Sequence, residues 1–317
     1  MQRNYSIDSL KFVCAFLVVL LHTDCAFHYA LLPLTKCAVP CFFIISGYLL
    51  YDGERIGDSR LKRSVVHISK IMFWATVLFA IYKELGALRH HELYVPTLID
   101  LASFVLFNEN PFGFHLWYLG AYLYVLFLMI YVDRQRKWKL VFIAAVLMLV
   151  VDILFYLLLC NNEIQVFVYR NFLGTGLPYF VIGVWIKRNA TFGCKTINLL
   201  FLFILFSVTS IAERSVLAIF DANPSREYYI STTFLAVTLF MLFLSFNQER
   251  HTLMSELGER YSLYIYIFHP LFLMCFRPLV AVLPGPLAAI YYWTAPFVIL
   301  QVSVMFTVVL KKLKLVP

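Results

Sequence analysis

The sequence predicts an all-α membrane protein that crosses the bilayer about ten times, and three observations support this. Of its 317 residues, 62% are hydrophobic and only 14% are charged, whereas a soluble domain is about half apolar and about a quarter charged. The apolar residues gather in runs of about 20, the length that an α-helix needs to span a membrane. The lysines and arginines concentrate in the short segments between these runs.

The candidate spans occupy nearly the whole chain, and no polar stretch between them is long enough to fold alone. We therefore expect one transmembrane domain over residues 1–317. The first run lacks a small-residue cleavage site, so we expect it to be kept as a helix. The ten spans are expected at 8–29, 37–51, 64–83, 114–132, 140–160, 171–187, 197–219, 229–247, 260–282 and 287–310.

The distribution of basic residues predicts the orientation of these spans. With both termini in the cytoplasm, most of the 26 lysines and arginines lie on the inner side, as the positive-inside rule requires. This accounts for the net charge of +8, so nucleic acid is not an expected partner. Residues 97–107 are apolar but too short to span, and we expect them to be re-entrant or interfacial on the outer side. The seven cysteines lack metal-ligand spacing, and no metal site is expected.

The first span carries two ionisable residues, Lys11 and His22. Eleven positions at about 100° per residue make about three turns, so both side chains are expected on one helix face, roughly 16 Å apart. Asp8 lies within pairing range of Lys11. Ionisable groups inside a membrane are functional by default, and a neutral imidazole can act as a general base. The alternatives are that Lys11 reaches the inner headgroups and that His22 forms an interhelical hydrogen bond.

The second span and the segment after it contain further candidates. Ser46 and Gly47 are small residues in FFIISGYLL, and they suit close helix packing, with a substrate contact at Ser46 as the functional alternative. The next segment, DGERIGDSRLKR, places Arg60 and Arg63 at an expected helix start. Basic side chains together with helix N-terminal amides suit an anionic phosphate. The alternative is that the positive-inside rule alone accounts for these charges.

Polar residues also occur at the outer ends of later spans. His115 and Trp117 open the fourth span, where an aromatic belt explains the tryptophan and His115 serves as an anchor or a substrate contact. Arg170 and Asn171 precede a helix broken by glycine and proline, and such irregular backbone is tolerated where it lines a cavity. Arg170 would bind an anionic or sugar group, or stay among the headgroups. His269 is a second deep histidine.

Four of these stretches together resemble the motifs of the acyltransferase-3 family, the bacterial integral membrane O-acyltransferases. They are IDSLKFVCAFLVVLLH, FFIISGYLL, HLWYL and SLYIYIFHP. The resemblance implies ten helices in the bacterial inner membrane, acyl-CoA as a cytoplasmic donor and an acceptor modified at the outer face. The family's arginine–histidine pair corresponds to Lys11 and His22, where lysine keeps the charge but lacks the bidentate fork. The family's basic motif corresponds loosely to Arg60 and Arg63.

The resemblance implies a membrane-bound O-acyltransferase that moves an acetyl or succinyl group from acyl-CoA to a hydroxyl of an envelope glycan or its lipid-linked precursor. His22 and Lys11 would be catalytic, and Arg60, Arg63 and Lys11 would bind the donor. Two other functions stay open: a transporter or flippase for a small polar solute or glycan lipid, and a membrane-anchoring subunit without chemistry. The residues expected to contact the acceptor are His115, Trp117, Arg170, Asn171, His269 and Ser46.

Overall fold

The computed structural model describes residues 4–88, 91–158, 166, 169–189, 194–220, 226–314 and 316. The described residues form helices and connecting loops, without a β-strand. The chain divides into two compact units. Unit 1 comprises Met1–Phe42 and Gly193–Pro317, and unit 2 comprises Phe43–Phe192. Arg3 and Cys160, one in the expected inner N-terminal segment and one in a predicted span, lie outside the described residues.

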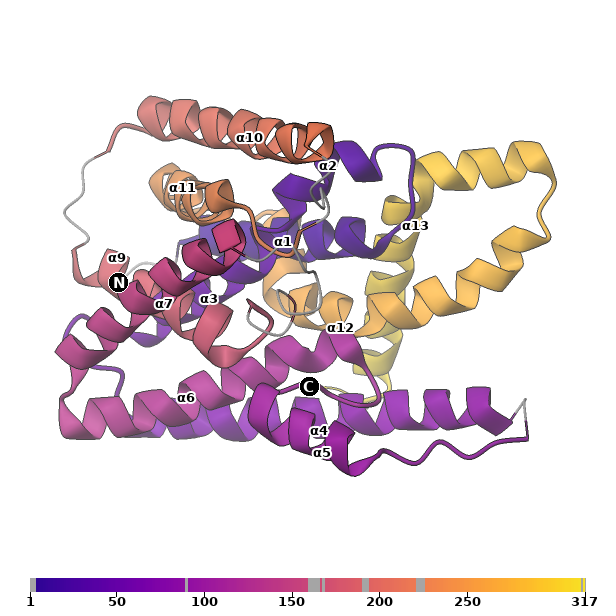
Figure 1. Cartoon of the computed structure of the whole chain (residues 1–317), viewed down its shortest axis with the longest axis horizontal. Coiled ribbons are helices and arrows are strands. Elements are labelled where there is room, and N and C mark those ends of the chain that lie inside the picture. Colours follow the sequence, from indigo (N-terminus) through magenta and orange to yellow (C-terminus); the bar gives the residue numbers. More distant parts are fainter. Residues whose placement is uncertain are drawn as a thin grey trace. The chain divides into compact units, whose positions relative to one another are not determined.

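Unit 1 contains the first helices of the chain and its last four. Figure 1 shows the final helix, α13 (yellow), bending along its length. It contains Pro296, and an interior proline removes a backbone hydrogen bond and bends a helix. The helices of unit 1 are α1 (Tyr5–His22), α2 (His28–Thr35), the start of α3 (Ala38–Leu50), α10 (Thr196–Ile219), α11 (Ile230–Phe246), α12 (Leu253–Ala281) and α13 (Gly285–Lys312).

Unit 2 contains the rest of α3 and the helices up to α9. It includes one five-residue stretch of π-helix, η2, a rare geometry that occurs mostly as single turns at functional sites. The elements of unit 2 after α3 are α4 (Asp58–Leu88), α5 (Leu98–Phe107), the 3₁₀ turn η1 (Phe114–Leu116), α6 (Trp117–Gln135), α7 (Trp138–Leu158), η2 (Phe172–Gly176) and α9 (Leu177–Arg188).

The protein is an all-α polytopic membrane protein, as the sequence predicts. Eight helical stretches among the described residues are long and apolar enough to cross a membrane. The other two predicted spans coincide with η2 plus α9 and with the 17-residue α11, so the number of crossings stays a prediction. The ten-residue α5 is too short to span, as expected, and its position at the membrane surface stays a prediction too.

Large apolar side chains remain exposed along α4, α7 and α10, as expected of helices that contact lipid. Phe73 and Trp74 of α4 and Phe201 of α10 are more than half exposed. Three buried hydroxyl groups of unit 1 are satisfied within their own helices, because Ser262, Ser303 and Thr307 each donate to a carbonyl four residues earlier. Such bonding removes the cost of an unpaired polar group in hydrocarbon.

The first helix is shorter than predicted, and this changes the setting of His22. The predicted span ran to residue 29, but α1 ends at His22. Thr23 is extended, and its hydroxyl donates to the carbonyl of Val19 at 2.6 Å, so a side chain satisfies one of the open carbonyls of the last turn. A hydropathy window averages over such a cap and misses it. His22 therefore lies on the last turn of α1 rather than inside it.

Candidate functional site

Two histidines from distant parts of the chain meet inside unit 1. His22, on the last turn of α1, stacks against His269 of α12, with ring centroids 5.4 Å apart and an interplanar angle of 24°. His269 is fully buried, and His22 is half-buried. The sequence predicts both residues as candidates but gives no reason to pair them. The structure brings them together, and only His22 retains exposed surface.

The backbone fixes the orientation of the His269 ring. Its Nδ1 lies 3.1 Å from the carbonyl oxygen of Ile265, one turn earlier on α12. Because a carbonyl only accepts, Nδ1 carries the hydrogen in this bond. The basic lone pair of the neutral ring is then at Nε2. A residue held in one tautomer is suited to position a neighbouring imidazole.

Close packing of α1 against α12 creates this pairing. The two helices run parallel within unit 1: the Tyr5 amide donates to Gln248 just before α12, and its ring meets His251 edge-on. Further along, a Cβ atom added to Gly258 would lie 1.7 Å from the carbonyl oxygen of Asp8. The two backbones are therefore in contact, and only glycine fits at this position.

Lys11 is paired with Asp8, as the sequence predicts. Its Nζ lies 2.9 Å from Asp8 Oδ1, and the Asp8 residue is 4% exposed. The ammonium therefore compensates part of the charge of a carboxylate that is almost entirely buried, and an uncompensated buried charge is strongly destabilising. Lys11 consequently offers less uncompensated charge to a donor phosphate than an unpaired lysine would.

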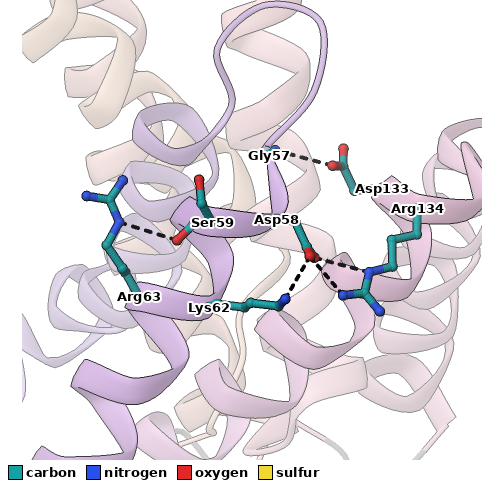
Figure 2. A network of polar contacts seen from close by, with 7 residues as sticks. All are labelled: Gly57, Asp58, Ser59, Lys62, Arg63, Asp133 and Arg134. Atoms are coloured by element: carbon teal, nitrogen blue, oxygen red, sulfur yellow. Dashed lines mark hydrogen bonds and ion pairs between the residues drawn. The ribbon is translucent and has the colours of Figure 1, made fainter.

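A polar network surrounds the start of α4 in unit 2 (Figure 2). Asp58 accepts hydrogen bonds from Arg134 of α6 at 2.8 and 3.1 Å and pairs with Lys62 at 3.0 Å. Asp133 accepts from the amides of Ile56 and Gly57 at 3.1 and 3.2 Å. Asp133 therefore occupies two amides that lie just before the first residue of α4, and phosphate binding at this segment stays a prediction.

Arg60 and Arg63 are exposed, as are Arg55 and Lys62 of the same segment. Arg60 donates to the carbonyl of Leu50 at 3.0 Å, and Arg63 donates to that of Ser59 at 3.3 Å; Figure 2 shows the Arg63 side chain directed away from Asp58. Neither guanidinium forms an ion pair within the described part of the chain. Their charge is thus open to an anionic ligand, whereas that of Lys62 and Arg134 is shared with Asp58.

The SGYLL motif has a packing role. A Cβ atom at Gly47 would lie 2.0 Å from the Phe180 carbonyl oxygen, and one at Gly183 would lie 2.1 Å from that of Ile44. The two glycines thus let α3 and α9 pack backbone against backbone. Packing therefore explains Gly47. Ser46 is half-buried and forms a hydrogen bond with Tyr122 of α6.

Two of the predicted acceptor residues, Trp117 and Arg170, line one cavity of unit 2. We call it the Trp117–Arg170 pocket, and its volume is about 270 Å³. It combines an aromatic ring and a guanidinium with carboxylates and an amide, so it offers both donors and acceptors of hydrogen bonds. Its polar and aromatic lining comprises Asp100, Ser103, Glu109, Asn110, Phe114, Trp117 and Arg170.

Asn108 assembles this pocket, and sequence reasoning missed it. Its amide nitrogen donates to the carbonyls of both Trp117 and Arg170 at 3.1 Å, and the residue is 1% exposed. Its φ of 57° is left-handed, which asparagine tolerates better than most residues. Gly120 leaves room for it on α6, where an added Cβ would lie 2.8 Å from the Asn108 Cβ. The polar NEN sequence at residues 108–110, shortly before HLWYL, is the feature of the sequence that could have identified Asn108 as a candidate.

The other two predicted acceptor residues in this part of unit 2 do not line the pocket. His115 is buried, with its ring edge-on to Phe79 at a centroid distance of 4.5 Å. Asn171 caps η2, accepting from the amides of Leu173 and Gly174 at 2.8 and 2.9 Å.

Asp152 of α7 is a further polar residue that the sequence analysis did not identify, and it is 2% exposed. A lone acid inside a predicted span was a clear signal for it.

The comparisons with known proteins agree with the resemblance of the motifs. The model of the acyltransferase-3 family, described as an acyltransferase domain, matches residues 4–310, nearly the whole chain. Searches of the curated proteins and of the solved structures found no match.

Proposed function

The chain belongs to the acyltransferase-3 family, and from that premise we propose which acyl group moves between which partners. The donor is acetyl-CoA or succinyl-CoA from the cytoplasm. The acceptor is a hydroxyl of a cell-envelope glycan or of its lipid-linked precursor, and the membrane is the bacterial inner membrane. The observation that carries the proposal is the His22–His269 pair, a base and a positioning group held between two packed helices.

In this proposal His22 is the general base and His269 orients it. His22 is chosen because it keeps exposed surface, whereas His269 is fully buried and cannot reach an acceptor directly. His22 takes the proton of the acceptor hydroxyl as its oxygen attacks the thioester carbonyl carbon. The carbon–sulfur bond then breaks, and the departing thiolate of CoA takes that proton back from the His22 imidazolium. General base catalysis of this kind typically contributes about 10²–10⁴-fold in rate.

Donor binding is assigned chiefly to Arg60 and Arg63. Both are exposed and without a carboxylate partner in the described residues, which suits the phosphates of CoA. Lys11 adds positive charge, but its main contact is Asp8. We therefore assign Lys11 two roles of equal weight: stabilising the first turns of α1 through the ion pair with Asp8, and binding a donor phosphate.

Acceptor binding is assigned to the Trp117–Arg170 pocket, whose mixture of donors, acceptors and an indole face suits a saccharide. The mechanism uses neither His115 nor Asn171 as a substrate contact, because aromatic packing and helix capping account for their side chains.

The test is mass analysis of surface glycans from cells with and without the protein. We expect O-acyl groups, visible as an added acetyl or succinyl mass, only where the wild-type protein is present. A His22→Ala variant in equal amount in the membrane should abolish the added mass, and His67→Ala, at an exposed histidine of α4, should retain it. Glycans of identical mass with and without the wild-type protein would refute the proposal.

A further inference from the structure

We propose that the Trp117–Arg170 pocket selects a saccharide acceptor that carries no negative charge. This inference rests on the proposed function, because it concerns the acceptor of the same transfer. A lone arginine at such a site suggests an anionic ligand, and the sequence alone left that possibility open. The carboxylates that line the same pocket favour an uncharged ligand instead.

Among the described residues, the charges that line the pocket are two carboxylates and one guanidinium. Asp100 comes from α5, Glu109 from the loop after it, and Arg170 from the segment before η2. All three are half-buried, so bulk water screens them less than it screens surface groups. A ligand carboxylate in this pocket would gain one favourable partner and meet two repulsive ones.

Asp100 is held in its charged form. Thr97 donates its amide and its hydroxyl to Asp100 Oδ2, each at 2.8 Å. These hydrogen bonds keep the pKa of Asp100 below its ordinary value, so the residue is ionised at neutral pH. The negative charge at this edge of the pocket is thus part of the α5 capping box.

Lys83 of α4, a cation that acts electrostatically on Asp100, does not reverse this balance. Lys83 donates to the carbonyl of Pro111 at 2.9 Å and lies 3.5 Å from the centre of the Tyr94 ring. Beside it, Glu84 accepts from the amide of Tyr94 at 3.2 Å. Lys83 is therefore engaged with a carbonyl and a ring, and a further carboxylate accompanies it. Counting Asp100, Glu109 and Glu84 against Arg170 and Lys83, these described residues carry an excess of negative charge.

Neutral hydroxyl groups match the same side chains well. Asp100 and Glu109 accept hydrogen bonds from hydroxyls, Arg170 donates to ring or glycosidic oxygens, and the half-buried indole of Trp117 offers an apolar face. Asn108 fixes the spacing of Trp117 and Arg170 through their backbones. The site therefore discriminates by charge as well as by shape, since like charges brought together repel each other.

Two probes that differ in one group test this inference. The full-length protein in detergent is mixed with methyl glucoside or with methyl glucuronide, in which a carboxylate replaces the hydroxymethyl group. Saturation-transfer NMR measures binding, with empty micelles as the blank. We expect the glucoside to bind and the glucuronide to bind about tenfold more weakly. Glu109→Gln should raise glucuronide affinity relative to glucoside affinity several-fold, because it removes a carboxylate that repels the ligand carboxylate.

The control variant is Glu92→Gln, which removes an exposed carboxylate that does not line the pocket and should leave both affinities unchanged. Equal binding of the two probes, tighter glucuronide binding, or no binding of either would overturn the inference. A Glu109→Gln protein that still unfolds cooperatively but shows no gain in relative glucuronide affinity would also overturn the inference. The binding measurement uses no acyl donor. The inference about charge selectivity can therefore fail while glycan O-acylation is still observed. Equally, O-acylation can be absent while the pocket still prefers the neutral saccharide.

Discussion

At the scale of single residues, the molecule separates charges that are already paired from charges that are open to a ligand. Lys11 is compensated by Asp8, and Lys62 by Asp58. Arg60 and Arg63 donate to backbone carbonyls and form no ion pair with a described residue. Four cations that look alike in the sequence therefore have different roles. The resemblance places the key positive charge on the first helix, whereas the contacts favour the two arginines of α4 as the donor site.

This distinction predicts a kinetic difference between neighbouring variants. Arg60→Gln and Arg63→Gln should each raise the KM for acyl-CoA about tenfold, because a charge-assisted hydrogen bond contributes about 1.5–3 kcal/mol. The KM for the acceptor should change little. Initial-rate measurements on membranes, with donor and acceptor varied separately, give both constants.

Lys62→Gln is the matched control for the two arginine variants, since it removes one positive charge from the same helix turn. Its charge is shared with Asp58, so the donor KM should stay within about twofold of wild type. A donor KM raised equally by all three substitutions would mean that only the overall positive charge of the segment matters. Donor and acceptor KM values rising together would count against a phosphate site.

At the scale of helices, close backbone contacts position the functional side chains. Gly258 lets α12 reach α1, and Gly47 and Gly183 join α3 to α9. The sequence indicates packing at Gly47, because small residues in a membrane span are typical of places where two helices approach closely. It does not identify Gly258 or the pairing of His22 with His269, because these contacts join segments about 250 positions apart.

The contact at Gly258 predicts a loss of both stability and activity in Gly258→Ala. The added Cβ would overlap the Asp8 carbonyl, so α12 must shift, at a cost of about 1–3 kcal/mol. The shift would also displace His269 from His22. We expect a lower melting temperature in detergent and an acyl-transfer rate reduced at least about tenfold.

Gly86→Ala is the control for this substitution, because Gly86 lies in α4 with no atom near its added Cβ. Alanine favours a helix by about 1 kcal/mol over glycine, so this variant should be as stable as wild type or slightly more so. A Gly258→Ala protein with unchanged melting temperature and rate would show that α1 and α12 are not in backbone contact.

At the scale of the whole molecule, composition and charge distribution were sufficient to predict an all-α polytopic membrane protein. The end of α1 at His22 was not predictable from hydropathy, because a threonine cap rather than a polar run ends the helix. The Trp117–Arg170 pocket was predictable only in part. Its two named residues stand at conspicuous positions, but Asn108 joins them through backbone carbonyls that no sequence pattern reveals.

The predicted orientation leads to a labelling experiment on intact cells. Cys194 is exposed in a segment expected to face the cytoplasm, and Glu92 is exposed in a segment expected to face outward. A membrane-impermeant maleimide should label the Glu92→Cys variant and leave Cys194 unlabelled until the cells are opened. Labelling of Cys194 in intact cells would reverse the assigned topology, and with it the side from which acyl-CoA arrives.

The most direct test of the central claim is the acyl-transfer rate of the purified protein in lipid vesicles with His22 and His269 replaced one at a time. We expect His22→Ala to lower kcat by about 10²–10⁴-fold with little change in the KM for acyl-CoA. His269→Gln, which can still donate a hydrogen bond, should lower kcat less and shift the pH at which the rate is half-maximal. A His22→Ala protein that keeps more than a tenth of the wild-type kcat would contradict the assignment of His22 as the general base.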